Sequence, residues 1–600
     1  MTQTKKIVLK SKSNIMVDHS NQNGFYMYEK KPWLKYFGDV AHSIDYPRTS
    51  MYEAVMMTVA ENADEIAYDF MGITATYKQF AEQIDRFANV LAALGLKKGD
   101  KITIAMPTSP PGVTAFYAAN KLGAVSSMIH PLSTESEVAF YIEKSKSKMA
   151  LTLDIFYDKF RAVQKRTNLE TLVIAKMQDY LPMHLSALYW LKQGRKNPKV
   201  KTTADVILLK DMLKTDLPMT PKAQVDPDEV AIILYSGGTT GKPKGILLSN
   251  YNFIAEGLMV ANWSGLDRKY PYMLAMLPIF HGFGLGVCVN ATFMAGGTCI
   301  MVPLFNPDQV AKLIKKKRPN YLIGPPTLYA ALNKNENFQK ADLSCLKATF
   351  CGADTLPRVV KEEFESIVEK RGGKVSLLEG YGLTEAVTAI MATPLDQYRE
   401  GSIGIPFPNM LAKIVKSGTE EEAPVGEEGE ICVHGPAVML GYLEEPEETA
   451  KTLKKHEDEK IWLHTGDIGT MDEDGFFYFK LREKRMIKTS GMNVYPAQVE
   501  AQLYKHNAVA EACVIGVPDK DLVEKVKAYI ALKDPSKAGE ETKKELLEHC
   551  HKDLIKWSCP RDIEFIEELP KTLVGKIAFK ELEQTEIESL KAQGKYTGQR

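Results

Sequence analysis

The sequence lacks a net charge. Its 600 residues include 76 lysines and arginines against 76 aspartates and glutamates. Proteins that bind nucleic acid need a basic excess to contact phosphates, so this balance argues against that class. The eight cysteines include no CxxC pair and no metal-type spacing. They are predicted to be free thiols in a reducing compartment.

A secretory signal is also lacking, because no long apolar segment follows the basic start of the chain. We therefore expect a cytoplasmic protein. Residues 271–307 contain no Asp, Glu, Lys or Arg and are long enough to cross a bilayer. They also contain His281, Asn290 and several prolines and glycines. This mixture predicts a buried strand, loop, helix and strand of an α/β core.

The length and the patterning predict about two to four domains. From Met51 onward, helical and strand-like patterns alternate, which predicts parallel sheets. Residues 77–95 have apolar side chains at helical spacing and end on Gly95, a good helix C-cap. The expected division is an extension (1–50), a large domain (51–482) with a small β subdomain from about residue 380, and a C-terminal domain with a charged tail (483–600).

Residues 182–201 have the character of an insertion. Apolar side chains from Leu185 to Leu191 are followed by basic residues between Lys192 and Lys201. An amphipathic helix with a basic flank can lie on an anionic membrane surface. Packing on the chain's own domain is the alternative, and we favour it because short helices of this kind are common.

The stretch SGGTTGKPKG, from Ser236 to Gly245, follows the apolar run VAIILY. A Walker A loop is excluded, because Ser236 replaces its first glycine and Pro243 replaces its Ser or Thr. Residues 246–249 are predicted to form a second strand, and Ser249 is predicted to cap a helix. A glycine-rich loop between two strands, with hydroxyls and lysines, predicts a flexible clamp over phosphates.

Five motifs in a fixed order give the sequence a family resemblance. They are YSGGTTGKPKG (235–245), YGLTE (381–385), HTGD (464–467), REKRMIKTSG (482–491) and PKTLVGKI (570–577). In this order they resemble the motifs of the acyl-adenylate-forming enzymes, the AMP-binding superfamily of acyl-CoA synthetases, peptide-synthetase adenylation domains and firefly luciferase. The resemblance covers about residues 51–580. The opening from Lys31 and the insertion near Trp190 look most like bacterial fatty-acyl-CoA ligases.

The resemblance implies an α/β fold. Its large N-terminal domain would contain two stacked mixed or parallel sheets with helices and a small β subdomain, followed by a small mobile α+β domain. It also implies a reaction in two halves. A carboxylate attacks the α-phosphorus of ATP to give acyl-AMP and pyrophosphate, and the thiol of coenzyme A then displaces AMP. ATP, Mg²⁺, coenzyme A and a fatty acid are the implied ligands, and a homodimer is a further expectation.

The residues that the resemblance assigns to ATP lie in several of the motifs and in the CGAD turn. They are Ser236, Gly237, Gly238, Thr239, Thr240, Gly241, Lys244, Gly352, Ala353, Asp354, Tyr381, Gly382, Asp467 and Arg482. The loop hydroxyls and Lys244 would contact the β- and γ-phosphates. Tyr381 and the CGAD turn would line the adenine, and Asp467 and Arg482 would reach the ribose.

Four residues are implied in the chemistry. Glu385 is a hard oxygen ligand suited to Mg²⁺, and Thr384 would donate to the α-phosphate. Lys576 resembles the lysine that bridges the carboxylate and the α-phosphate, where its charge would stabilise the transition state. His281 would edge the acyl pocket, although a histidine in an apolar run is often only a satisfied core residue.

The second half-reaction is implied to need rotation of the C-terminal domain. Lys484 matches the hinge residue, and Lys488 and Gly491 are assigned to the coenzyme A passage. The family usually has glycine before the motif arginine and often an acidic residue after the hinge. This chain has Leu481 and Arg485 at these positions, so its hinge departs from the pattern.

The acid itself is the least specified partner. Glycines around His281 leave room for a chain, and no neighbouring Asp or Lys suits an amino group. Each buried methylene contributes about 0.8 kcal/mol, which favours a range of chain lengths. We expect medium- to long-chain fatty acids. The alternatives are an aryl or other apolar acid, transfer of the acyl group to a carrier protein, and a non-catalytic nucleotide- or acyl-binding protein.

Overall fold

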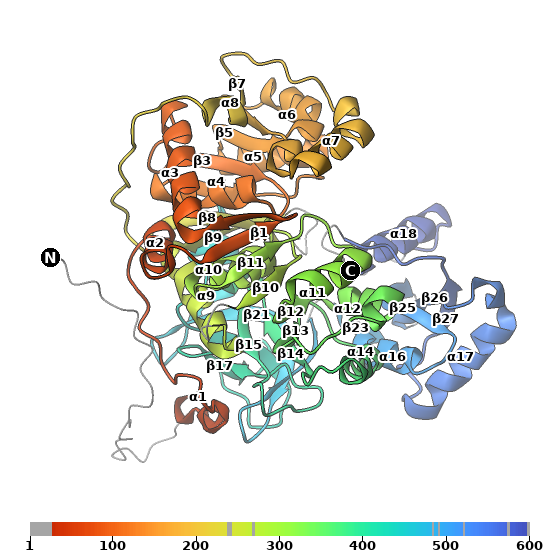
Figure 1. The fold of residues 1–600 in the computed structure, drawn as a ribbon. Coiled ribbons are helices and arrows are strands. Elements are labelled where there is room, and N and C mark those ends of the chain that lie inside the picture. The colour runs from red at the N-terminus through yellow and green to blue at the C-terminus, as the bar shows by residue number, and fades with distance from the viewer. Residues whose placement is uncertain are drawn as a thin grey trace, which may run out of the picture.

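The computed structural model describes residues 27–236, 243–266, 271–482, 485–489, 492–519, 522–572 and 576–596. Two large sheets and two smaller ones organise this part of the chain. Figure 1 shows the eight-stranded sheet in the upper part of the molecule, with the C-terminal elements in blue at one side.

The nine-stranded sheet has the order β16-β15-β14-β13-β12-β10-β11-β1-β2. Its centre is parallel, and its two ends are antiparallel. The strands are β1 (Ile66–Phe70), β2 (Ile73–Thr76), β10 (Tyr272–Ala275), β11 (Thr298–Met301), β12 (Tyr321–Gly324), β13 (Ala348–Cys351), β14 (Leu377–Gly382), β15 (Ala389–Ala392) and β16 (Ile405–Pro406).

The eight-stranded sheet has the order β19-β9-β8-β4-β3-β5-β6-β7. It is parallel from β8 to β7 and antiparallel at β9 and β19. Its strands are β3 (Lys101–Ala105), β4 (Val125–Met128), β5 (Met149–Leu153), β6 (Thr171–Ala175), β7 (Val206–Leu208), β8 (Val230–Ser236), β9 (Lys244–Ser249) and β19 (Gly441–Tyr442).

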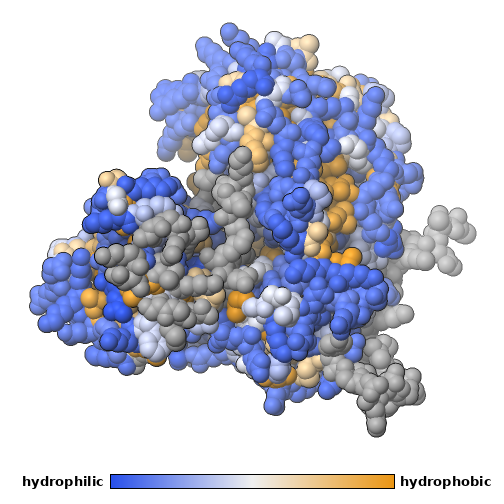
Figure 2. Space-filling model, turned by 180° about the vertical axis from the view of Figure 1, so that it is seen from behind, coloured by the Kyte–Doolittle hydropathy of each residue, from blue (hydrophilic) through white to orange (hydrophobic). Residues whose placement is uncertain are grey.

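Buried helices form the core of the large domain. Every residue of α4 (Pro110–Lys121) is buried, and α9 (Asn250–Ser264) is buried along nearly its whole length. A helix that is covered all round belongs to the interior. They pack with α2 (Met51–Asn62), α3 (Tyr77–Ala93) and α10 (Ala291–Met294). On the face that Figure 2 shows, hydrophilic residues predominate, as expected when the apolar side chains are turned inward.

The other helices lie around the two large sheets. They are α5 (Glu135–Ser145), α6 (Tyr157–Gln164), α7 (Met183–Lys192), α8 (Leu209–Met212), α11 (Pro307–Lys317), α12 (Pro326–Asn333), α13 (Glu336–Gln339) and α14 (Arg358–Lys370). The predicted C-cap is confirmed, since Gly95 follows α3 with a positive φ of 90°. Ser249 caps α9 as predicted, and its side chain accepts from the Asn252 N–H.

A five-stranded antiparallel sheet carries the next part of the chain. It consists of β17 (Leu411–Val415), β18 (Gly429–His434), β20 (Leu453–Lys455), β21 (Ile461–Met471) and β22 (Phe477–Arg482), with α15 (Pro446–Thr452) before β20. The N-terminal α1 (Met27–Lys30) packs on it. The Tyr28 ring lies 5.0 Å from the Trp462 ring, and the Tyr28 hydroxyl donates to Asp458 at 2.6 Å.

The C-terminal sheet has its own hydrophobic core. Its strands are β23 (Ile487–Thr489), β24 (Met492–Val494), β25 (Val509–Asp519), β26 (Val523–Leu532) and β27 (Asp562–Phe565). The helices α16 (Pro496–Tyr504), α17 (Glu540–Asp553) and α18 (Phe579–Ala592) surround it. The predicted α/β fold class is therefore confirmed, whereas the domain boundaries stay a prediction.

The prediction that residues 271–307 form buried elements of the core is also confirmed. Residues 271–307 form β10, a π-helix (Phe283–Asn290), α10 and β11 within the core. Within the described residues, no helix has both the length and the apolar character that a membrane crossing needs. All eight cysteines are free, and seven of them are buried.

A buried carboxyl group lies behind the π-helix. Glu256 of α9 has no exposed surface, and its Oε1 accepts from the Ala389 N–H at 3.4 Å. Its Oε2 has no hydrogen-bond partner among the described residues. Burial raises the pKa of this carboxyl group from 4.5 to about 8, and the Ala389 N–H opposes the shift. Glu256 is therefore neutral in the folded protein at neutral pH.

This pKa predicts a pH-dependent effect on stability. Between the ordinary value near 4.5 and about 8, the unfolded chain has lost the Glu256 proton and the folded chain still holds it. The contribution of Glu256 to stability is therefore greatest at low pH and is lost as the pH rises through this window. Glu256→Gln should melt close to the wild type near pH 5 and about a few degrees higher near pH 8.

Thermal melting between these two pH values checks the prediction. Glu82→Gln, on the exposed side of α3, is the matched control, and its melting temperature should follow that of the wild type at both pH values. A constant difference between Glu256→Gln and the wild type across the pH range would show that Glu256 is ionised in the folded state.

Candidate active site

A cavity of about 1300 Å³ lies where the two large sheets, the five-stranded sheet and the C-terminal elements meet. Most of the predicted site residues in the described part of the chain line it. These are Ser236, Lys244, His281, Gly352, Ala353, Tyr381, Gly382, Thr384, Glu385 and Lys576. Segments that are far apart in the sequence thus contribute to one site.

The β8–β9 hairpin, which the sequence predicts to be the phosphate side, forms one side of the cavity. Ser236 and Lys244 face each other across the antiparallel pair, so the predicted arrangement of strand, loop and strand is confirmed. The predicted loop residues Gly237, Gly238, Thr239, Thr240 and Gly241 lie outside the described residues. Lys244 donates to Glu448 Oε2 at 2.6 Å, and its ammonium lies 4.8 Å from the centre of the Tyr442 ring.

The YGLTE motif begins in the last two residues of β14 and continues beyond its end. Thr384 and Glu385 lie in a short 3₁₀ turn (Thr384–Ala386), and Glu385 Oε1 accepts from the Tyr442 hydroxyl at 3.0 Å. Gly382 has no room for a side chain, since a Cβ there would lie 1.4 Å from the Thr388 carbonyl oxygen. The glycine therefore lets the antiparallel partner strand approach and brings Glu385 to the cavity wall.

The CGAD turn forms another part of the wall. A Cβ on Gly352 would lie 3.0 Å from the Gly380 carbonyl oxygen, so a glycine keeps the turn close to β14. Ala353 has a positive φ of 74°, an uncommon conformation for a residue with a side chain. Asp354 is exposed and does not line the cavity. Of these three predicted residues, the structure thus brings two to the site.

Tyr381 and Asp467 are joined directly. The buried Tyr381 hydroxyl donates to Asp467 Oδ2 at 2.8 Å. Asp467 pairs with Arg482 across β21 and β22, and only the backbone of Arg482 is described. The structure thus brings together three residues that the sequence assigns to the nucleoside part of ATP.

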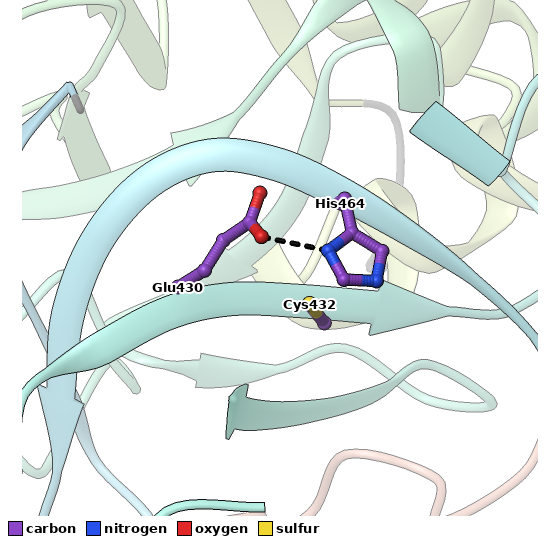
Figure 3. Close-up of side chains that lie close together, drawn as sticks. All are labelled: Glu430, Cys432 and His464. Carbon is purple, nitrogen blue, oxygen red and sulfur yellow. Dashed lines mark hydrogen bonds and ion pairs between the residues drawn. The ribbon is translucent and has the colours of Figure 1, made fainter. Parts of the chain in front are cut away.

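The HTGD motif lies within β21 at a shift in the strand register, and one carboxylate holds the local turn of the chain there. Glu430 Oε1 accepts from the Gly466 N–H at 2.8 Å, and Glu430 Oε2 pairs with His464 Nδ1 at 2.6 Å. Figure 3 shows this pair together with Cys432, which lies opposite His464 in the register of β18 and β21. His464 Nε2 lies 2.9 Å from His456 Nε2. Glu430 thereby fixes the backbone of the HTGD motif.

Glu430, Cys432 and His464 could also be metal ligands, since one donor atom from each lies within 4.8 Å of the others. Two observations favour a structural role. Both Glu430 oxygens already accept hydrogen bonds. The buried Lys413 pairs with Cys432 on the neighbouring strand. Burial raises the pKa of the Cys432 thiol, and the positive charge of the Lys413 ammonium opposes this shift. The same positive charge would repel a metal cation bound there. We therefore assign the cluster to holding the turn.

Lys576 reaches the cavity from the C-terminal part of the chain and also borders a small adjoining hollow with His281. Burial, together with the positive charge of Lys576, lowers the pKa of His281 to about 4. His281 is therefore a neutral imidazole at neutral pH, beside a lysine ammonium.

Part of the wall of the same cavity is apolar, and we call this part the apolar branch. Its walls come from α9, the π-helix and the nine-stranded sheet, and they are formed by Val260, Trp263, Val287, Ile323, Met391, Ala392 and Phe407. All of these side chains are apolar and buried. A carboxylate at Lys576 could therefore have a hydrocarbon chain enclosed behind it.

Less of the hinge motif can be located. Lys484 and Gly491 lie outside the described residues, and only the backbone is described for Leu481 and Lys488. Arg485 has a clear environment. It forms an ion pair with Glu500 of α16, and its guanidinium lies 4.9 Å from the centre of the Phe579 ring. These contacts explain how the chain accommodates a basic residue at this position.

Three residues of the site were not predicted from the sequence. Tyr442, Glu430 and Glu448 each line the cavity and contact a predicted residue or its turn. Tyr442 and Glu448 lie in the segment GYLEEPEET, which has no obvious chemical pattern. The GEIC stretch around Glu430 shows only a strand between turns, and strand register alone brings its carboxylate to the HTGD turn.

Comparison with known proteins agrees with this geometry. The family model described as AMP-binding enzyme matches residues 56–443, and the model described as AMP-binding enzyme C-terminal domain matches residues 498–576. The chain belongs to the AMP-binding enzyme family.

Relatives within the family are similar over nearly their full length. A long-chain-fatty-acid–CoA ligase of Bacillus subtilis is 36% identical over 94% of this chain and 99% of its own. A ligase of the same name from Escherichia coli O157:H7 is 33% identical over 92% and 98%. The crystal structure of the anthranilate CoA ligase AuaEII in complex with anthranoyl-AMP is 25% identical, with a TM-score of 0.79 over 91% of this chain and 98% of that one.

The hydrogen bonds of Glu430 predict how its loss would affect ATP binding by this AMP-binding enzyme. Glu430→Ala should raise the KM for ATP roughly tenfold with a smaller effect on kcat, because lost charge-assisted hydrogen bonds cost about 1.5–3 kcal/mol. Since Asp467 is predicted to bind the ribose hydroxyls, the variant should also discriminate less between ATP and 3′-deoxy-ATP.

Steady-state kinetics with both nucleotides measures these effects. Glu430→Gln still has an oxygen that can accept from Gly466 and should recover much of the loss. Glu427→Ala, at an exposed position in the preceding turn, is the control and should behave as the wild type. An unchanged preference for ATP over 3′-deoxy-ATP in Glu430→Ala would contradict the positioning role.

Proposed function

We propose that the protein is an AMP-forming ligase that joins long-chain fatty acids to coenzyme A. The observation that carries the proposal is that one cavity is lined by Lys576, by the polar motif residues and by the apolar side chains of the apolar branch. The proposed reaction requires ATP, Mg²⁺ and coenzyme A, and the match to the AMP-binding enzyme family supports the use of ATP. The names of the bacterial relatives support the choice of acid.

In the first half-reaction, a carboxylate oxygen attacks the α-phosphorus and pyrophosphate leaves. We propose that Lys576 donates to both the carboxylate and the α-phosphate, and that Thr384 donates to the same phosphate. Glu385 is the proposed ligand of Mg²⁺, which would offset phosphate charge. The neutral His281 adds no further charge where the acid enters.

In the second half-reaction, the thiol of coenzyme A attacks the acyl carbon and AMP leaves. Lys576 then has no further function at the phosphate. We propose that the C-terminal domain (483–600) rotates on the large domain (51–482) about Lys484, which removes Lys576 and opens a passage along Lys488 and Gly491. The separate hydrophobic cores of the two parts support such a movement.

The apolar branch supports a fatty acid over a polar one. Each methylene buried there contributes about 0.8 kcal/mol, so affinity should rise with chain length until the branch is full. Aryl acids, the alternative, would occupy only the part of the branch nearest to His281.

A panel of acids from acetate to oleate tests this function. With ATP and Mg²⁺, we expect coenzyme A-dependent release of AMP that is greatest for long chains. Lys576→Ala should lower adenylation roughly 10²–10³-fold, as removal of other transition-state donors does. The same variant should still form thioester from supplied acyl-AMP.

Each outcome has a clear meaning. A preference for aryl acids would replace the substrate assignment, and AMP release that is independent of coenzyme A would indicate another acceptor. Failure to split ATP with every acid would exclude the ligase function. Equal loss of both half-reactions in Lys576→Ala would exclude its bridging role.

We further propose that α7 contacts an anionic membrane surface, where fatty acids partition. The prediction favours packing of this segment on its own domain, yet none of the residues of α7 is buried. Met183, Trp190 and Leu191 are 88%, 52% and 51% exposed. Basic residues from Lys192 to Lys201 follow. Exposed apolar side chains beside a basic flank are typical of interfacial helices.

The cytoplasmic location and the homodimer stay predictions.

Co-sedimentation with vesicles tests this contact. The wild type should bind vesicles that contain phosphatidylglycerol more strongly than vesicles of phosphatidylcholine alone. Trp190→Ala with Leu191→Ala should reduce the binding severalfold, because both lipid-facing groups are lost. Leu304→Ala with Met219→Ala, which removes even more exposed apolar residues elsewhere, is the control. An equal loss in both variants would contradict a role for α7.

A further inference from the structure

A carboxylate lies on the phosphate side of the cavity, where the ligand is itself an anion. Glu448 of α15 lines the cavity together with Lys244, Tyr442 and Lys451. Its Oε2 accepts from Lys244 Nζ at 2.6 Å, and its Oε1 accepts from Lys451 Nζ at 2.9 Å. The two oxygens of one carboxylate thus hold two lysines.

Lys244 is enclosed by this contact. Its side chain is 14% exposed, and its ammonium lies between the Glu448 carboxylate and the face of the Tyr442 ring. The Tyr442 hydroxyl donates to Glu385, the proposed Mg²⁺ ligand. The carboxylate is therefore attached to the same group of side chains that the phosphates and their metal ion would contact.

Glu448 is charged at every pH at which the enzyme would work. Hydrogen bonds from Lys244 and Lys451 lower the pKa of its carboxyl group to about 2. A carboxylate and a phosphate oxygen accept the same charge-assisted hydrogen bonds from lysine. Both anions cannot be fully paired with the same two ammonium groups, and any phosphate beside the carboxylate is repelled by it.

We propose that Glu448 competes with the phosphates for Lys244 and Lys451, and that it promotes pyrophosphate release by taking these lysines back. Between turnovers the carboxylate holds the lysines, and an arriving triphosphate displaces it. When adenylation separates pyrophosphate from the nucleotide, Glu448 rebinds the lysines as the product leaves. This inference rests on the proposed function, which assigns Lys244 to the β- and γ-phosphates.

The adjacent residue provides a matched control. Glu447 lies on the same short helix, is exposed, and does not line the cavity. Glu447→Gln and Glu448→Gln remove the same charge from neighbouring positions and keep the size of the side chain. A general effect of net charge would therefore be equal in the two variants, whereas competition at Lys244 requires a larger effect in Glu448→Gln.

Calorimetric binding of Mg²⁺-pyrophosphate and Mg²⁺-ATP, without any acid or coenzyme A, tests the inference. Loss of a neighbouring charge should let Glu448→Gln bind pyrophosphate roughly three- to tenfold more tightly than the wild type. Glu447→Gln should bind as the wild type does. In turnover assays, added pyrophosphate should inhibit Glu448→Gln at correspondingly lower concentration.

Two results would overturn the inference, and they are distinguishable. In the first, the wild type binds both ligands, but Glu448→Gln binds pyrophosphate no more tightly than Glu447→Gln does. Glu448 then does not compete for the lysines, and the proposed function is unaffected. If the wild type binds neither ligand, the proposed function fails and the inference fails with it.

Discussion

The site depends on one electrostatic constraint, the need to bring a carboxylate and a triphosphate together although both are anions. Cations must lie between them, and the charge must be compensated where water is largely displaced. The structure supplies Lys576 from the C-terminal elements and Lys244 from the β8–β9 hairpin. The rest of the fold determines how far apart these two charges lie.

In this architecture, the buried scaffold is separate from the polar and charged residues of the cavity. Buried helices such as α4 and two large sheets form a scaffold, and the cavity residues lie at strand ends and in the turns between strands. Two of these turns are fixed by local contacts. One is held by close backbone packing at Gly382, and the other by the hydrogen bonds of Glu430. The apolar branch, in contrast, is built from the interior of the scaffold itself, which allows it to exclude water behind His281.

Much of the fold and part of the site could be predicted from local sequence signals. Alternating patterns indicated the α/β class, the composition of residues 271–307 indicated core rather than membrane, and Ser249 indicated the start of α9. The motifs indicated which residues would be found together, because their order and spacing resemble those of the acyl-adenylate-forming enzymes. Glu430 and Glu448 could not be predicted in this way, since a glutamate in a strand or a short helix usually faces solvent.

The sequence by itself determined the chemical groups, their order along the chain and the secondary structure that carries them, because these depend on residues close together in the chain. Only the tertiary structure decided that Glu448 would meet Lys244, that Glu430 would hold the turn before Asp467, and that Lys576 would lie beside His281. These contacts join segments separated by 36 to 295 residues, so strand register and packing set them, and no local pattern contains that information.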